Sequence, residues 1–444
     1  MDTTFRSMYQ GLYIYLSARK ERRDLLLSQR PPRFDESLDS MISRSEDDFT
    51  RIALKAKAAQ DYFLLIGPPG TGKTSCALKK MVETFHADKD AQILLLSYTN
   101  RAVDEICKSL ASIAPAVDFI RVGSELSCDE AYRGHLIENE LSSCNRRSEV
   151  YERIRNCRII VGTVAAISGK PELFRLKHFD VAIIDEATQI LEPQLLGILC
   201  ARGEDGKDAI DKFVLIGDHK QLPAVVQQNT EQSAIYDESL LSIGLTNLKD
   251  SLFERLYRNC TATVHRSYDM LCRQGRMHPE VALFANRAFY GGRLIPVGLP
   301  HQIESSDTIC RLAFYPSVPE KAGASAKINY SEARIVADLA VRIYEDHQTD
   351  FDESRTLGII TPYRSQIALI KKEIESLGIP ALNRILVDTV ERFQGSERDV
   401  IIYSFCVNYP YQLKFLSNLT EEEGVLIDRK LNVALTRARK QMFI

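Results

Sequence analysis

The stretch Leu64-Leu65-Ile66-Gly67-Pro68-Pro69-Gly70-Thr71-Gly72-Lys73-Thr74 decides the fold of this chain. It matches the pattern G-x-x-x-x-G-K-[ST], with an apolar run of strand length before it (62–66) and a helix-compatible segment after it (75–85). Glycines at this spacing let the backbone wrap closely, so that N–H groups and the helix N-terminus face phosphate oxygens. We therefore expect Lys73 to reach the β- and γ-phosphates of a nucleoside triphosphate, and Thr74 to place its hydroxyl on Mg²⁺. The residues expected to surround the nucleotide are Gly67, Pro68, Pro69, Gly70, Thr71, Gly72, Lys73, Thr74 and Ser75.

The composition is that of an ordinary globular chain. Its 444 residues are 45% hydrophobic and 26% charged, which is enough for two or three domains with sizeable cores. No uncharged apolar run approaches the roughly 18 residues of a membrane span, and residues 1–4 do not resemble a signal peptide. The ten cysteines contain no C-x-x-C pair, which favours a reducing compartment. These features predict a protein that is not secreted, does not bind membranes, and is cytoplasmic, or nuclear if its source is eukaryotic.

Two acids follow a second apolar run. Residues 181–184 are apolar and are followed directly by Asp185 and Glu186, the Walker B arrangement. We expect Asp185 to hold Mg²⁺ and Glu186 to orient and deprotonate the attacking water. The alternative, two solvated acids at a strand end, is less favoured behind a P-loop. A further run at 213–217 leads to Gln221, a candidate sensor of the γ-phosphate.

Apolar runs that alternate with helical periodicity predict two α/β domains. We expect a helical and polar segment at 1–50, a first domain at 51–260 and a second at 261–444. A charged stretch at 124–156 predicts a helical insertion in the first domain. The second domain has strands expected at 357–360, 385–388 and 400–405, a helix at 364–377 and a last strand from residue 440 or 441. Because the chain stops inside that expected strand, we expect it to be truncated.

The order of the motifs resembles superfamily I helicases, in the branch of the nonsense-mediated-decay RNA helicase and the replication/repair helicase–nuclease. The matching segments, which together cover roughly residues 60–444, are Gly67–Thr74, Ser97–Asn100, Val161–Thr163, Asp185–Thr188, Gly217–Pro223, Arg276–Pro279, Ile360–Arg364, Phe393–Glu397 and Leu431–Ala438. The resemblance implies two tandem RecA-like P-loop domains, each a parallel sheet flanked by helices. It also implies ATP between the domains and single-stranded nucleic acid across them.

The resemblance carries roles onto individual residues. Arg276 and Arg437 match the arginines that reach the γ-phosphate from the second domain, and Glu397 matches a position near the ribose. Such an arginine stabilises charge on the transferring phosphoryl group. The positions that match backbone contacts to nucleic acid are Thr99, Asn100, Thr163, Thr361, Arg364 and Thr389. Contacts of this kind fix position without reading sequence.

The chain departs from the family at both base-recognition positions. The family places a glutamine that reads adenine about 18 residues before the P-loop, where this chain has Phe49 and Thr50. A tyrosine that flanks adenine is replaced by Gly275. The phosphate-handling residues match, so we expect relaxed nucleobase selectivity.

Three readings of function stay open. The favoured one is an ATP-driven helicase or translocase on single-stranded nucleic acid, with DNA preferred over RNA and repair or replication as the setting. The second is an NTP-gated nucleic-acid clamp that hydrolyses ATP without processive unwinding. A third, a P-loop enzyme acting on a small substrate, would leave the motifs of the second domain unexplained. No nuclease signature is visible, so a nuclease domain or partner is expected outside these residues.

Overall fold

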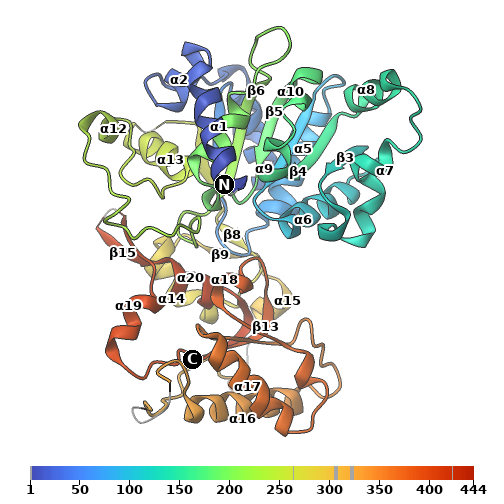
Figure 1. Ribbon diagram of the computed structural model, residues 1–444. Coiled ribbons are helices and arrows are strands. Elements are labelled where there is room, and N and C mark those ends of the chain that lie inside the picture. The colour runs from blue at the N-terminus through green and yellow to red at the C-terminus, as the bar shows by residue number, and fades with distance from the viewer. Residues whose placement is uncertain (1–2, 264, 305–308, 321–324, 423) are drawn as a thin grey trace. The chain divides into compact units, whose positions relative to one another are not determined.

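The computed structural model describes residues 3–263, 265–304, 309–320, 325–422 and 424–444. The chain forms two compact units, each an α/β layer structure (Figure 1). The first unit comprises the chain up to Pro68 together with Gly72–His219 and Pro223–Leu271. The second comprises Pro69–Thr71, Lys220–Leu222 and Cys272–Ile444.

The first unit is built on a seven-stranded sheet in the order β3-β4-β2-β5-β6-β1-β7, in which all neighbouring strands are parallel. The strands are β1 (Tyr62–Ile66), β2 (Ile93–Ser97), β3 (Phe119–Val122), β4 (Ile159–Thr163), β5 (Phe179–Ile184), β6 (Ile210–Gly217) and β7 (Tyr268–Met270). All five residues of β1 are buried, because helices cover both faces of a parallel sheet. Phe63 and Leu65 point into one core while Leu64 points into the other, as the two-residue period of a strand requires.

Different helices cover the two faces of this sheet, and each face has its own hydrophobic core. One core takes its helical residues from α4 (Asp48–Ala58), α5 (Lys79–His86) and α6 (Asn100–Ala111). The other takes them from α2 (Lys20–Leu26), α9 (Val164–Ser168), α10 (Glu172–Leu176), α11 (Glu192–Leu199) and α13 (Leu252–Ala262). The remaining helices are α1 (Thr3–Ser17), α3 (Asp39–Arg44), α7 (Ile137–Glu140), α8 (Arg147–Asn156) and α12 (Glu238–Ser242).

Helices α1 to α4 lie within residues 3–58, and α7 and α8 lie within the 124–156 stretch. Strand β3, just before that stretch, was not expected from the sequence. The unit boundary also differs from the predicted one, since the first unit runs to Leu271 and not to residue 260. The change of composition near Cys260 marks the end of α13. Strand β7, which pairs with β1, still belongs to the first sheet.

The second unit has a five-stranded parallel sheet in the order β10-β16-β13-β11-β12. Its strands are β10 (Leu312–Ala313), β11 (Leu357–Ile360), β12 (Leu386–Asp388), β13 (Arg398–Tyr403) and β16 (Ala438–Phe443). Two smaller pairs are β8 (Arg273–Gln274) with β9 (Ile295–Pro296), and the antiparallel hairpin of β14 (Leu419–Glu422) and β15 (Val425–Asp428). The helices are α14 (Pro279–Tyr290), α15 (Pro300–Ile303), α16 (Tyr330–Asp346), α17 (Arg364–Ser376), α18 (Val390–Phe393), α19 (Leu413–Leu416) and α20 (Arg429–Leu435).

The large sheet of the second unit is also buried on both faces. Ile359 and Ile402 lie in the core under α16 and α17, whereas Ile360 and Ile401 lie in the core under α18 and α20. The strands predicted at 357–360, 385–388 and 400–405 are present within two residues, and the predicted last strand begins earlier, at Ala438. No helix among the described residues is long and apolar enough to cross a membrane.

Asp61 anchors the start of β1, the strand that feeds the P-loop. Its carboxylate is buried and accepts both guanidinium arms of Arg30, at 2.9 and 2.8 Å. It also accepts the side chain and the backbone N–H of Arg33. Burial would raise the pKa of Asp61, but these donors outweigh it and hold the pKa well below its usual range. The N-terminal segment is therefore fixed to the strand by charge-assisted hydrogen bonds.

We expect Asp61→Asn to lower the free energy of unfolding by about 2–3 kcal/mol at pH 7, less than the full cost of breaking a buried pair because Arg33 is largely exposed. A depressed pKa in the folded state contributes stability above the unfolded pKa, about 3.9, and that stability is lost as the pH falls. The difference between the thermal melts of the two proteins should therefore begin to shrink below pH ~4, and it should close only at a pH below the depressed pKa of the folded state. Glu21→Gln, an exposed acid on α2, is the control. Equal melting temperatures at pH 7 would contradict the assignment.

Candidate nucleotide and nucleic-acid site

The P-loop leaves the carboxyl end of β1 and turns into a helix at Lys73. Gly70 and Gly72 have φ angles of +75° and +73°, a left-handed conformation that other residues adopt only with strain. At Gly67 a Cβ atom would lie 2.8 Å from Lys73 Cβ, so the loop also needs glycine there to wrap around its lysine. The glycines thus form the close backbone cradle that the sequence predicts.

The lysine and the Walker B acids meet in this cradle. Lys73 Nζ lies 2.8 Å from Glu186 Oε1, and Thr74 Oγ1 donates to Asp185 Oδ2 at 2.5 Å. The P-loop follows β1 and the acids follow β5, and both strands pair with β6 between them. Parallel strands end at the same edge of a sheet, which explains why residues more than a hundred positions apart are in contact.

The pKa values of Lys73 and Asp185 are both raised in this group, for different reasons. Burial alone would lower the pKa of Lys73, but the carboxylates of Glu186 and Asp185 outweigh it and raise the pKa. Burial raises the pKa of Asp185, and the neighbouring charge of Glu186 adds to the rise. Two buried acids this close together repel each other, and a cation between them and the phosphates of a nucleotide would reduce that repulsion.

Glu186 has a strained backbone, with φ of 53°, in the left-handed region that a non-glycine residue seldom adopts. Such strain concentrates at functional sites, where the surrounding structure holds it. The Glu186 N–H donates to Asp185 Oδ1 at 2.8 Å, and Gln189 Nε2 donates to Glu186 Oε2 at 2.7 Å. Gln189 therefore holds the Glu186 carboxylate in place, a contact that sequence reasoning missed although Gln189 directly follows the Asp185–Thr188 segment.

The oxygen donors beside the P-loop fit Mg²⁺. The Thr74 hydroxyl and the Asp185 carboxylate are hard oxygen ligands that already lie together. Ser97 Oγ donates to the Asp185 backbone carbonyl at 3.3 Å, which fixes the acid's position at the end of β5. Asp185 and Thr74 are therefore the residues that would hold the ion.

The arginines of the second unit are held in polar networks. Arg276 Nε donates to Glu397 Oε2 at 2.5 Å. Glu397, the position expected near the ribose, is therefore paired here with one of the two arginines expected to reach the γ-phosphate. The charge of Arg276 lowers the pKa of Glu397 in spite of its burial. Arg437 is buried, and its Nη2 donates at 3.2 Å to Oε1 of Gln221, which groups with the second unit. Arg437 also donates to the carbonyl of Val433 at 2.9 Å.

The predicted nucleic-acid residues of the first unit are at the starts of helices that follow strands. The Thr99 hydroxyl accepts from the Ala102 N–H at the start of α6, and Thr99 is exposed. Asn100 is half-buried beside it. The Thr163 hydroxyl caps α9 in the same way, at 3.1 Å from the Ala166 nitrogen, but the side chain is buried. Thr99 and Asn100 are thus accessible, while Thr163 supports its helix.

The three predicted nucleic-acid residues of the second unit differ in exposure. Arg364 is exposed at the start of α17, and Thr389 is half-buried before α18. Thr361 has no exposed surface, and its hydroxyl has no hydrogen-bond partner among the described residues. Its side chain does not reach solvent, so Arg364 and Thr389 are the accessible positions at this edge.

Two family models, both described as an AAA domain, match the chain: one matches residues 44–150 and 137–229, the other residues 248–444. The chain is 29% identical, over 96% of its length, to the DNA replication ATP-dependent helicase/nuclease DNA2 of Xenopus laevis. These matches confirm the resemblance to superfamily I helicases.

Other matches are also to proteins named helicases, and they differ in the share of each relative's length that this chain covers. The DNA polymerase alpha-associated DNA helicase A of Saccharomyces cerevisiae is 24% identical over 92% of this chain and 66% of its own length. The Xenopus relative is much longer, and the match covers 41% of it. A solved arterivirus helicase in complex with DNA aligns with 88% of this chain and 62% of its own at 16% identity and a TM-score of 0.42, a likeness too loose for inference.

The structure shows the two positions at which the sequence departs from the base-recognition pattern of these helicases. Phe49 begins α4 and its ring tip faces the P-loop, because a Cβ atom built on Gly72 would lie 3.5 Å from Phe49 Cζ. The Thr50 hydroxyl is engaged by the Asp47 carboxylate at 2.5 Å. Neither residue offers a free amide at this place. In the second unit, a Cβ on Gly275 would meet Leu299 at 3.2 Å.

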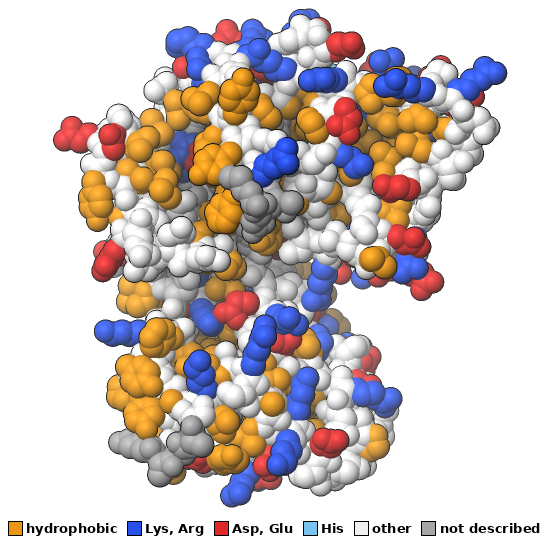
Figure 2. Space-filling model, viewed as in Figure 1, with side chains coloured by type: hydrophobic (Ala, Val, Ile, Leu, Met, Phe, Trp, Pro, Cys, Tyr) orange, Lys and Arg blue, Asp and Glu red, His pale blue; other side chains and the backbone are white. Residues whose placement is uncertain are grey.

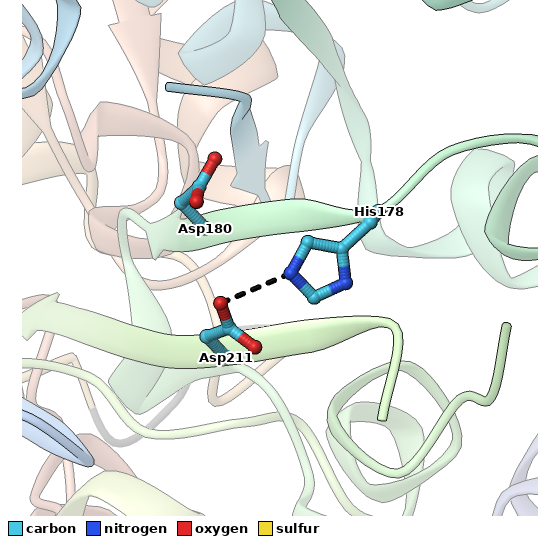
Figure 3. Close-up of side chains that lie close together, drawn as sticks. All are labelled: His178, Asp180 and Asp211. Atoms are coloured by element: carbon cyan, nitrogen blue, oxygen red, sulfur yellow. Dashed lines mark hydrogen bonds and ion pairs between the residues drawn. The ribbon is translucent and has the colours of Figure 1, made fainter. Parts of the chain in front are cut away.

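A second group of polar residues lies away from the P-loop. His178, Asp180 and Asp211 lie close together at the amino ends of β5 and β6, the edge opposite the P-loop (Figure 3). His178 Nε2 lies 3.0 Å from Asp211 Oδ2, and Asp180 accepts the Gln92 N–H at 2.6 Å. His178 and Asp211 are exposed, and each of the three side chains takes part in one of these two contacts. We assign no metal to them.

Proposed function

We propose that this chain is an ATP-driven helicase or translocase on single-stranded nucleic acid, with DNA as its track. The observation that supports this most directly is the group formed by Lys73, Thr74, Asp185 and Glu186 at one edge of the first sheet. A phosphate cradle, an ion site and a base are the parts that hydrolysis of a nucleoside triphosphate needs. The helicase names of the relatives and their replication setting support the choice of DNA.

The chain's residues divide the work of hydrolysis. The P-loop backbone binds the phosphates. Lys73 leaves its ion pair with Glu186 and pairs with the β- and γ-phosphate oxygens instead. Glu186 is then free to accept a proton from the attacking water at a carboxylate oxygen, while Gln189 keeps it oriented. Thr74 and Asp185 would hold Mg²⁺, which would neutralise charge on the phosphates.

Arg276 and Arg437 are proposed to stabilise the charge of the transferring phosphoryl group. In this structure Arg276 is paired with Glu397, and Arg437 with Gln221. The paired arginines exchange these partners for phosphate when nucleotide is bound, which links hydrolysis to a rearrangement of the second unit. Thr99, Asn100, Arg364 and Thr389 contact the nucleic-acid backbone, with Thr163 and Thr361 in supporting places. We place the protein in the cytoplasm, or in the nucleus of a eukaryote, where such a track is found.

Unwinding of a tailed DNA duplex separates the motor from a clamp. The proposal predicts ATP-dependent release of the shorter strand from duplexes with a 5′ or a 3′ tail, and the tail that works names the polarity. Lys73→Ala should abolish release. ATP hydrolysis that DNA stimulates without any strand release or translocation would instead support a clamp.

We also predict relaxed nucleobase selectivity, because Phe49 and Gly275 stand where the family reads adenine. GTP and CTP should be hydrolysed with kcat/KM within about tenfold of ATP, a difference of at most ~1.4 kcal/mol in transition-state binding. Phe49→Gln restores an amide beside the P-loop and should raise the preference for ATP. The measurement is steady-state hydrolysis of each nucleotide. A wild-type preference for ATP well above tenfold would refute this prediction.

A further inference from the structure

Three neighbouring aromatic side chains lie at the surface of the second unit, outside every motif described above. Tyr409 and Tyr411 are stacked with ring centroids 5.7 Å apart, and Phe415 meets Tyr411 edge-on at 6.4 Å. Tyr411 is 54% exposed and Phe415 is 71% exposed. We call Tyr409, Tyr411 and Phe415 the aromatic platform. Figure 2 shows hydrophobic side chains gathered on the flank of the second unit where α19 lies.

The platform stands on a fixed base. Gln412 stands between Tyr411 and Phe415 in the sequence, and its side chain is buried. It donates to the Tyr363 hydroxyl at 3.1 Å and to the Ala326 carbonyl at 2.9 Å. Asn408 is also buried and donates to the carbonyls of Ala326 and Ile328. Buried amides with satisfied hydrogen bonds hold the loop in one conformation, so the aromatic rings are presented rather than loosely exposed.

The platform lies at the same sheet edge as the proposed nucleic-acid contacts. Strands β12, β11 and β13 are consecutive neighbours in the sheet, and all three are parallel. Thr389 follows β12, Arg364 follows β11, and the loop with the platform follows β13. The carboxyl ends of parallel strands form one edge, where ligands of such sheets bind. The platform therefore extends the line of predicted backbone contacts.

Positive charge accompanies the rings. Lys327 lies 6.0 Å over the ring of Tyr363, the residue to which Gln412 binds, and Lys327 is exposed. Arg364 follows Tyr363 directly and is exposed, and Lys414 is exposed within the platform loop. Exposed aromatic faces beside cations are the chemistry of single-strand binding, where bases stack on rings and phosphates meet Lys and Arg.

We propose that the aromatic platform stacks on unpaired bases of the single-stranded nucleic acid that occupies this edge. The inference rests on the proposed function, and it adds a base-stacking subsite to a set of contacts otherwise made with the backbone. Every base has a π face, so stacking of this kind tolerates any sequence, as a motor requires. Tyr411 and Phe415 supply the accessible faces, and Tyr409 supports Tyr411 from behind.

The test compares two ligands that differ only in their bases, an oligo-dT strand and an abasic strand of equal length, by fluorescence anisotropy with the whole chain. Tyr411→Ala and Phe415→Ala should each weaken binding of oligo-dT by about 5-fold or more, and leave binding of the abasic strand within twofold. Tyr411→Phe keeps the ring and should bind as wild type, whereas Tyr411→Leu should lose affinity as alanine does. Tyr9→Ala, an aromatic residue equally exposed on α1, is the matched control.

The outcomes separate this inference from the proposed function. If the wild-type chain binds oligo-dT and both alanine variants bind it equally well, the platform does not stack on bases and another partner covers it. Equal weakening toward both strands would also overturn the inference, since it would indicate a general effect on the second unit. If the wild-type chain binds neither strand, the proposed function itself fails. The thermal melt of Tyr411→Ala should match that of the wild-type chain, which would show that the second unit remains folded.

Discussion

Replacing Glu186 with glutamine should lower kcat for ATP hydrolysis by about 10²–10⁴ and leave ATP binding intact. Glutamine keeps the size of the side chain and an oxygen that can accept from Gln189, whose Nε2 lies 2.7 Å from Glu186 Oε2. It cannot take a proton from the attacking water. It also frees Lys73 from an ion pair of 2.8 Å, so the affinity for ATP should stay equal or rise. Single-turnover hydrolysis and equilibrium binding of a labelled nucleotide measure the two effects separately.

Glu83→Gln, on α5 directly behind the P-loop, is the control for changing an acid near the site. It should hydrolyse ATP as the wild type does. A Glu186→Gln protein that retains kcat within threefold would show that another group accepts the proton. Loss of nucleotide binding together with hydrolysis would instead show that Glu186 mainly positions Lys73.

Replacing Arg437 with alanine should lower kcat by about 10³–10⁵, with a smaller change in the affinity for ATP, if Arg437 stabilises the transition state as proposed. Arg437 is one of the largest fully buried side chains of the described chain, and its Nη1 donates to the Ser396 carbonyl at 3.3 Å. A buried guanidinium held by Gln221 and by backbone carbonyls is pre-oriented. It therefore loses little side-chain entropy when it binds a phosphoryl oxygen. Arg437→Lys keeps the charge but loses the planar fork, and should recover only part of the rate.

Because Arg437 is buried, a loss of folding must be separated from a loss of catalysis. The thermal melt of Arg437→Ala should still show a cooperative transition, and its nucleotide affinity should be measurable. Arg384→Ala, an exposed arginine of the same unit paired with Glu353, controls for removing a positive charge. A folded Arg437→Ala protein with hydrolysis within tenfold of wild type would remove Arg437 from the catalytic group.

The parts of the site that the sequence predicted are those in which short-range pattern and chemistry coincide. The glycines of the P-loop, Lys73 and Thr74 stand in one segment. Asp185 and Glu186 directly follow an apolar run of strand length, and the carboxyl ends of parallel strands meet at one edge of a sheet. Parallel strands with apolar runs of four to six residues left little freedom in the fold class. The four strands predicted in the second unit lie within three residues of their predicted bounds for the same reason, whereas β10 of the same sheet was not predicted.

The parts that were not predicted depend on contacts between distant segments. Strand β7 is three residues long and has no apolar run, so only its pairing with β1 assigns it to the first unit. The pairing of Arg276 with Glu397 joins residues 121 positions apart, and nothing in either motif indicates it. Thr361 was expected to be accessible, yet neighbouring side chains bury it completely. The role of Gln189 depends on the strained turn at Glu186.

The most direct test of the account is NTP hydrolysis by the purified chain with and without single-stranded DNA and RNA. The account predicts that DNA stimulates hydrolysis strongly, and that Lys73→Ala abolishes both basal and stimulated turnover. Stimulation by RNA alone would keep the motor and change its track. Hydrolysis at the same rate with DNA, with RNA and with neither would contradict the proposal that this chain couples the nucleotide site to nucleic acid.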